Sequence, residues 1–533
     1  MKKTLLSIGF IVCWNVLVCQ DNEKELAING LFVSNLNFAI KDEKIGASAT
    51  PFYEDKKWGG DAWLDINAYY RNWQFSTRLD GYHHSILLNP EDVYTKYGIG
   101  YFNVRYSGDN FNIEGGHFYG QIGNGLIMRS YRDLNLLIDN SILGVKGEVY
   151  LPRNQKLMLF GGKPKDLFHL EPLWNAGGEY RNDWKIGSVY LSTGAGGSFK
   201  FLDQSMINDL VDEVQYYFPE DRVELYRSSQ AITFFNDLSA GVFNWALEYS
   251  MKFHDPFYNS ESLRTLGSGE NVLGRFETKT GKAFYTQFGL DFEKISFQLE
   301  GKYIDRFINK SDPFSFNYRN DLNFIPPMAR VQTYRLKARY IPATQFLGEK
   351  SLQMGITYPL KKHLFQWSNT LIYKLDNSRL YEEYDLQWEH RDESSKWVGG
   401  LMYQDYNQSI YEGKGGNLRI QSWIPYVEFY KRIKGDQSLK IESQSLLTEQ
   451  DKGNLFFVGM EYALSSQWTF NLSCMYEQKA SLFYPSGGFF YRGGNGLYGL
   501  NFVKQLEGYV CSGGICRYEP AFSGVKVSVQ TRF

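Results

Sequence analysis

Residues 64–82 read LDINAYYRNWQFSTRLDGY, and this stretch decides the fold. Apolar side chains alternate with polar ones before and after a short polar turn at Asn72. A period of two residues places successive side chains on opposite faces of a strand, so the stretch predicts a β-hairpin with one apolar and one polar face. The wall of a membrane barrel needs this division, because lipid contacts one face while water or packed polar groups contact the other.

Six more hairpins with the same pattern follow along the chain. Their short turns are expected at residues 108–110, 152–154, 182–183, 293–294, 434–436 and 465–466. Longer polar segments separate the hairpins, at residues 41–60, 121–141, 196–230, 254–281, 306–330 and 407–420. Short connections on one side and long connections on the other are typical of the periplasmic and extracellular rims of a barrel. The alternation is regular to about residue 330 and unclear beyond it.

The first 19 residues are typical of a cleaved secretory signal peptide. Lys2 and Lys3 precede an apolar stretch over residues 5–18, and cleavage is expected between Cys19 and Gln20. A lipid anchor on Cys19 is disfavoured, since Val18 stands where a lipoprotein signal needs a small residue. Together with the strand pattern, this segment predicts export to the cell outer membrane of a Gram-negative bacterium.

The length of the remaining chain sets the number of strands. About 514 of the 533 residues follow the signal peptide, and roughly 21 residues per strand and connection give about 24 strands. We therefore expect one domain over residues 20–533. Its fold class is all-β, a transmembrane antiparallel β-barrel with an even number of strands between about 20 and 26, short periplasmic turns and long extracellular loops.

Composition excludes several other classes of protein. The chain has 39 Tyr, 39 Phe and 12 Trp, which is typical of barrels with aromatic residues at both membrane interfaces. Mean hydropathy is −0.40 and no apolar run after residue 19 is long enough for a spanning helix, so a helical inner-membrane protein is excluded. The net charge of −2 comes from interleaved acids and bases, which leaves no basic surface for nucleic acid. Nothing indicates a cofactor.

The last ten residues, GVKVSVQTRF, form an alternating strand that ends on Phe533. In water such an apolar edge strand would favour aggregation, so a position in a barrel wall explains it better. A closing strand with a terminal aromatic residue resembles the signal by which insertion machinery recognises outer-membrane barrels. The expected partners are therefore the lipid bilayer and, during insertion, the barrel-assembly machinery.

Three cysteines remain after the signal peptide, in an oxidising compartment. Cys511 and Cys516 flank Ser-Gly-Gly-Ile, in which two glycines permit a tight reversal of the chain. We expect a local disulfide between these two residues. Cys474 is then left as a free thiol.

Two motifs together suggest a family. The first runs through Gly123-Asn124-Gly125-Leu126 and Arg132-Asp133-Leu134 to residues 139–144, and the second is Cys511-Ser-Gly-Gly-Ile-Cys516-Arg517 with the following Pro520. They resemble an uncharacterised family of Bacteroidota outer-membrane proteins, porin-like barrels of unknown role. The resemblance covers nearly the whole mature chain. It implies location and architecture but no substrate and no functional residues.

Residues 121–141 are the first candidate for a functional segment. Arg129, Arg132, Asp133 and Asp139 place both signs of charge in a short stretch that opens with glycine. A loop of this kind folded into the lumen can constrict a pore and select ions by facing rows of charge. The alternative is a rim loop whose acids and arginines cap turns and pair with one another.

Residues 196–230 carry many carboxylates, and their 206–214 portion could form a short amphipathic helix. A lumen plug, a ligand-binding lid and an extracellular loop all fit this segment. The carboxylates lack the spacing of a calcium loop, and His83, His84 and His117 are better explained as interfacial polar groups than as metal ligands. No nucleophile elbow is present, so we expect no metal site and no enzyme activity.

The leading hypothesis for function is a channel or transporter for an unidentified solute, because a lumen of this size is too wide for inward side chains alone to fill. A receptor with a separate plug domain is disfavoured, since strand pattern begins at residue 26. The second hypothesis is an accessory or structural subunit of an outer-membrane secretion or barrel-assembly machine. In that case the wall would bind other outer-membrane proteins.

Overall fold

The computed structural model describes residues 26–86, 93–134, 136–315, 318–330, 332–512 and 515–533, with the side chains of 510–516 left out. The signal peptide predicted for residues 1–19 lies outside the described residues. The strands of the chain form one dominant sheet and several short accessory hairpins.

The dominant sheet is a closed antiparallel barrel. It contains 25 strands, of which the two-residue β12 (His169–Leu170) only pairs with the end of one neighbour, leaving 24 in the wall. Its first and last strands, β1 and β33, pair with each other and close the sheet. The count of 24 confirms the expected architecture. Closure leaves no strand edge without hydrogen bonds, which a bilayer would not tolerate.

The wall strands follow one another around the barrel in chain order. They are β1 (Ala27–Ala39), β2 (Trp58–Tyr70), β3 (Trp73–Ser85), β4 (Tyr94–Ser107), β5 (Phe111–Phe118), β10 (Ile142–Leu151), β11 (Gln155–Asp166), β13 (Leu173–Ile186), β14 (Val189–Leu202), β15 (Ser228–Ala240), β16 (Phe243–Phe253), β19 (Gly281–Phe292), β20 (Ile295–Asp305), β21 (Gly348–Leu360), β22 (His363–Tyr373), β23 (Arg379–Arg391), β24 (Ser395–Asn407), β25 (Arg419–Arg432), β26 (Ser438–Leu446), β27 (Leu455–Ala463), β28 (Trp468–Glu477), β29 (Leu482–Gly493), β30 (Gly496–Gln505) and β33 (Phe522–Arg532).

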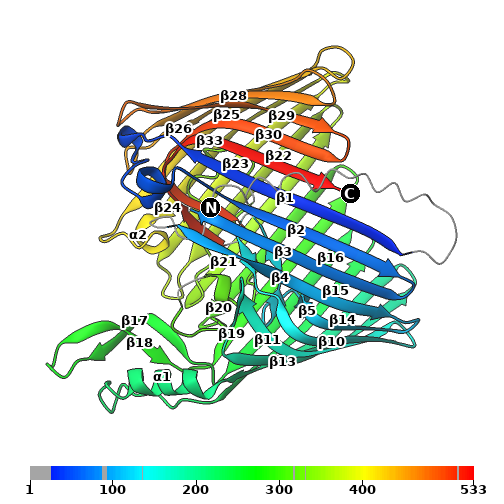
Figure 1. Ribbon diagram of the computed structural model, residues 1–533, viewed down its shortest axis with the longest axis vertical. Coiled ribbons are helices and arrows are strands. Elements are labelled where there is room, and N and C mark those ends of the chain that lie inside the picture. Colours follow the sequence, from blue (N-terminus) through cyan, green and yellow to red (C-terminus); the bar gives the residue numbers. More distant parts are fainter. Residues whose placement is uncertain (1–25, 87–92, 135, 316–317, 331, 513–514) are drawn as a thin grey trace, which may run out of the picture.

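The two ends of the barrel differ (Figure 1). One end carries only short turns, the start of β1 and the end of β33; we call it the turn end. The other, the loop end, carries the longer connections. The alternation is regular to the end of the chain, including the part after residue 330 where the sequence pattern was unclear. Connections 374–378 and 478–481 at the loop end are as short as turns, and length therefore did not reveal their side.

Six of the seven predicted turns are confirmed and one is wrong. Asn182 and Asp183 lie within β13, where they pair with Thr193 and Ser192 of β14. The turn is at residues 187–188, where Gly187 has a φ of +61°. Polar residues near the end of a strand resemble turn residues in sequence. Asp183, however, lies on the wall face that points into the lumen, where a polar side chain can be part of a strand.

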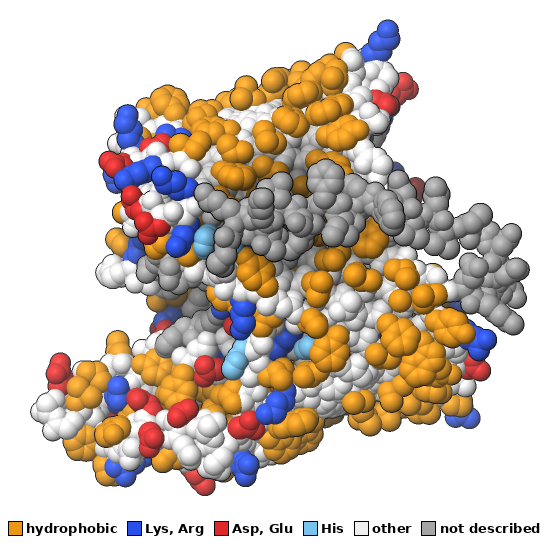
Figure 2. Space-filling view, viewed as in Figure 1, with side chains coloured by type: hydrophobic (Ala, Val, Ile, Leu, Met, Phe, Trp, Pro, Cys, Tyr) orange, Lys and Arg blue, Asp and Glu red, His pale blue; other side chains and the backbone are white. Residues whose placement is uncertain are grey.

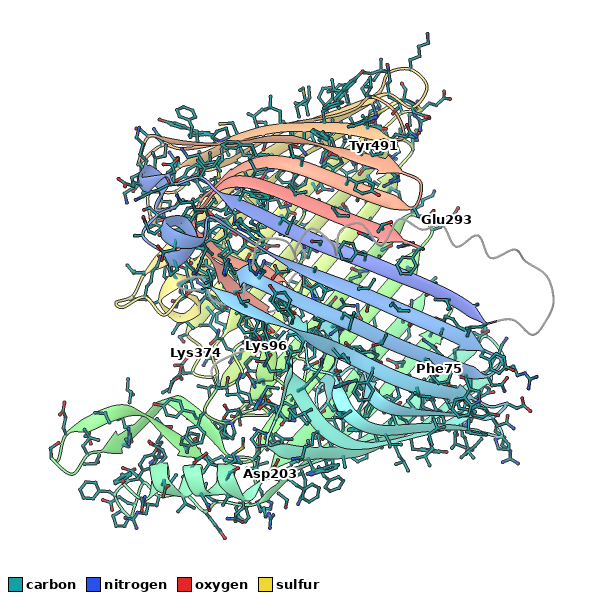
Figure 3. All side chains as sticks on the ribbon, in the orientation of Figure 1. Phe75, Lys96, Asp203, Glu293, Lys374 and Tyr491 are labelled. Carbon is teal, nitrogen blue, oxygen red and sulfur yellow. The ribbon has the colours of Figure 1, made fainter. Side chains whose placement is uncertain are left out.

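Apolar side chains cover much of the outside of the wall (Figure 2). Exposed aromatic residues near the turn end include Trp73, Trp184, Tyr190, Trp245, Trp388 and Trp397, and those near the loop end include Trp58, Tyr97, Trp174, Tyr249, Tyr303 and Trp423. Figure 3 shows Phe75 on the turn-end half of the wall and Tyr491 on the outside. A strand of 11 residues tilted by about 45° spans roughly 25 Å, which matches the apolar band of membrane barrels.

An extension projects from the loop end (Figure 1). It consists of α1 (Gln204–Val214) and the hairpin of β17 (Phe257–Thr265) and β18 (Asn271–Glu277). Met206, Leu210 and Val214 share one helical face and are buried in a small separate core with Phe276. The predicted helix is thus confirmed, and it lies beyond the barrel rim; residues 196–202 belong to β14. No helix in the described part of the chain is long and apolar enough to span a membrane.

The remaining elements are short. They are η1 (Glu43–Ile45), η2 (Phe52–Lys56), η3 (Tyr318–Asn320), α2 (Gln408–Tyr411), β6 (Gly120–Gln121), β7 (Arg129–Ser130), β8 (Arg132–Asp133), β9 (Ile138–Asp139), β31 (Gly508–Ser512) and β32 (Ile515–Glu519). Most belong to three connections at the loop end, residues 119–141, 306–347 and 506–521. We call these the first, second and third luminal segments, because their apolar side chains are buried together with inward-facing residues of the wall.

Candidate functional site

The first luminal segment packs into the barrel. Ile122, Leu126 and Ile127 are completely buried, in one core with Phe118 and Phe160 of the wall. Since apolar side chains of a rim loop would be exposed to water, their burial explains why the segment folds inward.

Glycine allows this segment to approach the wall closely. The backbone N–H of Gly123 donates to Glu179 Oε2 (2.7 Å), and that of Asn124 donates to Glu248 Oε2 (2.6 Å). A Cβ atom on Gly123 would lie 2.7 Å from Glu248 Oε1, and its φ of +55° also favours glycine. Two inward carboxylates from β13 and β16 therefore hold the tip of the segment.

Asp139 is the most strongly bound of the four charged residues that the sequence singled out. It is 6% exposed. Its carboxylate accepts hydrogen bonds from Tyr119 Oη (2.9 Å) and Lys165 Nζ (2.8 Å) and pairs with Arg78. Burial alone would raise the pKa of Asp139, but Lys165 and Arg78 outweigh it and hold that pKa below its ordinary value.

The side chains of the other three candidates contact the wall, the backbone of their own segment and the second luminal segment, while Arg132 and Asp139 are paired along the backbone of β8 and β9. Arg132 Nη1 donates to both carboxylate oxygens of Asp65 on β2, at 3.0 Å each. The Asp133 carboxylate accepts from the backbone N–H of Leu136 (3.2 Å). Arg129 stacks over Phe324, with its guanidinium carbon 4.1 Å from the ring centre. The charges thus attach the segment to the wall and to the second luminal segment.

Sequence reasoning missed the second luminal segment, whose 306–330 portion was expected only as a polar loop. Asn309 Nδ2 donates to the Ile127 carbonyl (3.1 Å) and Asn323 Nδ2 to the Leu126 carbonyl (3.1 Å), so the two segments are joined side by side. The sequence did contain a signal for this burial, in the apolar residues of the segment. Phe307, Leu322 and other apolar residues are too numerous for a water-exposed loop, and they are buried here.

The second half of this segment crosses toward the opposite wall. Lys337 Nζ forms an ion pair with Asp385 of β23 (2.7 Å), and the Leu336 N–H donates to Gln444 of β26 (2.8 Å). Tyr340 Oη donates to Asp451 (2.9 Å). Residues 325–330 and 332–340 therefore lie against β23–β27.

A buried row of polar side chains lies on the wall beside residues 325–340. Thr370, Glu383, Gln404 and Ser422 occupy directly paired positions on β22, β23, β24 and β25, and each is at most 1% exposed. Both side-chain polar atoms of Gln404, Ser422 Oγ and Glu383 Oε1 have no hydrogen-bond partner. We call these four residues the polar row. Thr370 reaches the Met328 carbonyl (3.4 Å), which places the row behind the second luminal segment.

The third luminal segment contacts the second. Arg339 Nη1 donates to the Glu507 carbonyl (2.8 Å). The β31–β32 hairpin pairs Cys511 directly opposite Cys516 along the backbone, while the side chains of both lie outside the described residues. Cys474 on β28 is a free thiol, as expected.

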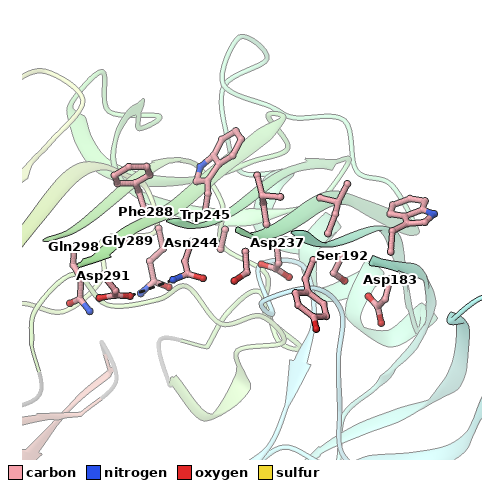
Figure 4. Close-up of a pocket in the computed structure, with 16 residues that line it drawn as sticks. Asp183, Ser192, Asp237, Asn244, Trp245, Phe288, Gly289, Asp291 and Gln298 are labelled. Carbon is pink, nitrogen blue, oxygen red and sulfur yellow. Dashed lines mark hydrogen bonds between the residues drawn. The ribbon is translucent and has the colours of Figure 1, made fainter. Parts of the chain in front are cut away.

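Toward the turn end the wall lines a hollow of about 570 Å³ (Figure 4). Asp183, Asp237 and Asp291 point to one side of the sheet, and Trp245 and Phe288 point to the other. The lumen at this end is therefore lined by polar side chains, whereas the loop-end half is filled by the luminal segments.

His83 and His117 pack against aromatic side chains of the wall. His83 stacks on Trp58, with ring centres 4.5 Å apart, and His117 packs edge-on against Phe102. Among the residues that the structure describes, no group of three His, Cys, Asp or Glu side chains could hold a metal ion.

Comparison with solved structures finds a translocation pore and two receptors of low sequence identity. The translocation pore of the P pilus usher PapC is 9% identical, with a TM-score of 0.46 over 95% of this chain and 99% of that one. The siderophore receptor PirA from Pseudomonas aeruginosa is 8% identical, with a TM-score of 0.39 over 96% and 81%. The ferric enterobactin receptor PfeA, as a mutant, from the same organism is 9% identical, with a TM-score of 0.41 over 95% and 80%.

Comparison with curated protein sequences finds no match. Comparison with family sequence profiles does, and the match extends over residues 1–366 and 363–533. Because this covers the whole chain, the protein belongs to the family of unknown function DUF6029.

Proposed function

We propose that the protein is an outer-membrane channel closed by its own luminal segments, and that it passes a solute when residues 325–340 move away from the wall. The outer membrane is proposed because the closed wall carries an apolar band with aromatic borders. The observation that supports a moving segment is the polar row, four buried polar side chains with several unpartnered atoms.

The polar row destabilises the fold while the second luminal segment covers it. A buried polar atom without a hydrogen bond destabilises a fold by about 1–3 kcal/mol. If the wall always stayed covered, apolar residues at these four positions would make the fold more stable. The neighbouring positions Met402 and Ile424 are apolar in this way and belong to the buried core. In a water-filled lumen, by contrast, the same polar side chains would be fully hydrogen-bonded and would line the passage.

The first luminal segment would remain in place and form the constriction. Its tip is held by Glu179 and Glu248, and its base by the ion pairs of Asp139 and Arg132. Together with Arg129 and Asp133 these are the residues that we propose to set the charge of the open passage.

Assembly would use the last strand. The Phe533 N–H donates to the Gly30 carbonyl (3.2 Å), and the Gly30 N–H donates to the Phe533 carbonyl (2.9 Å). Its ring covers Gly30, where a Cβ atom would lie 2.2 Å from Phe533 Cζ. We propose that this exposed aromatic terminus is presented to the barrel-assembly machinery before it closes on β1.

Single-channel recording tests the proposal. The full mature barrel is first shown to be folded by its heat-modifiable migration and is then recorded in planar bilayers. A double variant of the same barrel, which carries Leu336→Cys and Gln444→Cys, is recorded separately in the same way. Wild type is expected to open intermittently. The oxidised double variant is expected to stay closed until a reductant is added, and neither single variant should respond to that reductant. A folded wild-type barrel that is silent at all voltages, or a locked variant that conducts like wild type, contradicts the proposal.

An accessory role is the second candidate, and one observation favours it. Tyr216, Leu263 and Leu273 on the extension are 78%, 59% and 64% exposed, although they project away from the apolar band. An apolar tip of this kind could bind another outer-membrane protein. A photo-crosslinker at position 263 that captures the same protein in intact cells, combined with a silent purified barrel, would favour this role over the channel.

A further inference from the structure

We propose that the lumen contains a binding site for an oxyanion, formed by Arg335 of the second luminal segment, Arg517 of the third and Lys526 of β33. This inference deepens the proposed channel function, on which it rests, because it names the chemical class of the solute. The shared chemistry of that class is a phosphate, sulfate or carboxylate group.

Lys526 points into the lumen without an acidic partner. On the wall it is paired with Asn501 of β30 and Asn37 of β1, which are both uncharged. Its ammonium group lies 4.6 Å from the centre of the Phe522 ring. No described Asp or Glu forms an ion pair with it, so this inward cation has only neutral partners on the two neighbouring strands.

Arg335 faces the same region with no acidic partner either. Its guanidinium carbon lies 5.9 Å from the Phe457 ring centre, and no described carboxylate lies within ion-pair distance. Burial lowers the pKa of Arg335, and repulsion from Arg339 lowers it further. A negative group bound nearby would relieve both effects.

Arg517 supplies hydrogen-bond donors that are not used. Its side chain is 13% exposed, and one guanidinium nitrogen pairs with Glu519. Its Nε and Nη1 atoms are buried and have no hydrogen-bond partner. The Glu519 carboxylate cannot serve all three cations, since it also accepts from Gln505 Nε2 (2.6 Å).

The charges around this site do not balance. Arg335 and Arg517 both repel Lys526, and Glu519 alone attracts it. On the wall, Asp61 is attracted by Arg517, but the two do not form an ion pair. Three cations, Arg335, Arg517 and Lys526, thus face two carboxylates, Glu519 and Asp61. Two guanidinium groups and an ammonium group, with two unpartnered guanidinium nitrogens on Arg517, provide the positive charge and the donors that an oxyanion binds.

Calorimetric titration of the folded barrel in detergent tests the site. Inorganic phosphate, sulfate and succinate are titrated separately at low ionic strength, with glucose as a neutral control. The anion that binds most tightly shows whether the site prefers a phosphate, a sulfate or a carboxylate group. Lys526→Gln and Arg335→Gln are each expected to weaken binding by about tenfold. Lys504→Gln removes the same charge from a rim residue paired with Asp42, and it should change binding by less than about twofold.

Two outcomes would overturn the inference. One is the absence of saturable binding of all three anions to a wild-type barrel with heat-modifiable migration. The other is equal weakening by Lys504→Gln, which would show only a general effect of charge. Conductance without anion binding contradicts the site and leaves the channel proposal intact, whereas anion binding by a barrel that never conducts contradicts the channel proposal alone.

Discussion

At the scale of single residues, the lumen is held together by a few buried charges with several partners each. Asp139 binds two cations and a tyrosine, and Asp255 likewise lies between Lys200 and Lys252. Burial would raise the pKa of Asp255, but the two lysines hold it below its ordinary value. Such carboxylates stay ionised because the attraction to two cations exceeds the cost of their burial.

We expect Asp139→Asn to release the first luminal segment. The substitution leaves Arg78 and Lys165 buried without their shared partner, and breaking a buried ion pair in this way costs about 3–5 kcal/mol. Trypsin should then cut the folded barrel after Arg129 or Arg132, where wild type resists. The fragments are measured by mass spectrometry.

Asp183→Asn is the matched control for this prediction. Asp183 also lies on the inner wall, but it is exposed and forms no ion pair among the described residues. Its substitution should leave residues 119–141 protected. Equal protection of the Asp139 variant would show that the carboxylate does not hold the segment.

The partners of these residues could not be predicted from sequence. Arg129, Arg132, Asp133 and Asp139 were recognised because charge of both signs follows glycine within a short stretch. Arg78, however, is 61 residues from Asp139 in the chain, and only the closed wall brings them together. The sequence therefore indicates which segment is unusual, while the register of distant strands decides what each charge binds.

At the scale of elements, prediction succeeded where alternation was local and failed where a segment packed against distant strands. Hairpins such as β2–β3 follow from residues that alternate over a single turn. The second luminal segment has no periodicity, because its side chains fit a surface made by several strands. The 182–183 turn was misplaced for a related reason, since lumen-facing polar residues resemble turn residues.

The contact between the 167–172 loop and the second luminal segment should depend on pH. Glu171 is 6% exposed and accepts from Asn320 Nδ2 (3.1 Å). Burial, with repulsion from Asp166 and Asp312, raises the pKa of Glu171 to about 7. A raised carboxylate pKa means that its contribution to stability is fully present below about pH 4 and is lost as the pH rises through 7. The total change is of the order of 3 kcal/mol.

Hydrogen exchange measures this effect. Corrected for intrinsic rates, amides of residues 311–321 should exchange faster at pH 8 than at pH 5.5 in wild type. Glu171→Gln, which stays neutral, should remove the difference. Glu220→Gln, at an exposed position, should keep it. Identical pH dependence in wild type and Glu171→Gln would contradict the assignment.

The β31–β32 hairpin is expected to contain a disulfide. Directly opposed residues of antiparallel strands have Cα atoms about 4.5–5.5 Å apart, which suits a disulfide, and the backbone register opposes Cys511 and Cys516. The short loop limits the stabilisation to about 2 kcal/mol. Unfolded without reductant, the protein should be alkylated at Cys474 and at neither of the other two, as read by mass spectrometry. Alkylation of all three would refute the pairing.

At the scale of the whole molecule, the fold satisfies two requirements of a barrel wall in a bilayer. Every backbone amide in a bilayer needs a partner, and closure of β1 on β33 provides it for the first and the last strand. One face of each strand must tolerate hydrocarbon, and the outward positions are the apolar ones. These requirements explain why the strand number was predictable from length and alternation, whereas the contents of the lumen were not.

The bilayer-facing assignment makes the sharpest prediction for the whole molecule. Leu386 lies near the middle of β23 and is 59% exposed on the outer face. Leu386→Arg would place a cation near the bilayer midplane, which costs barrels about 2–4 kcal/mol. In phospholipid vesicles, its urea midpoint for unfolding, followed by tryptophan fluorescence and heat-modifiable migration, should fall accordingly.

Gln387→Arg is the matched control, because position 387 is next along the same strand and its side chain points into the lumen, where it donates to Gln366 (2.9 Å). A polar lumen can solvate the added charge, so we expect a smaller loss than at position 386. If the two variants unfold at the same urea concentration, or if Leu386→Arg is the more stable, the outer face does not meet hydrocarbon and the membrane assignment is wrong.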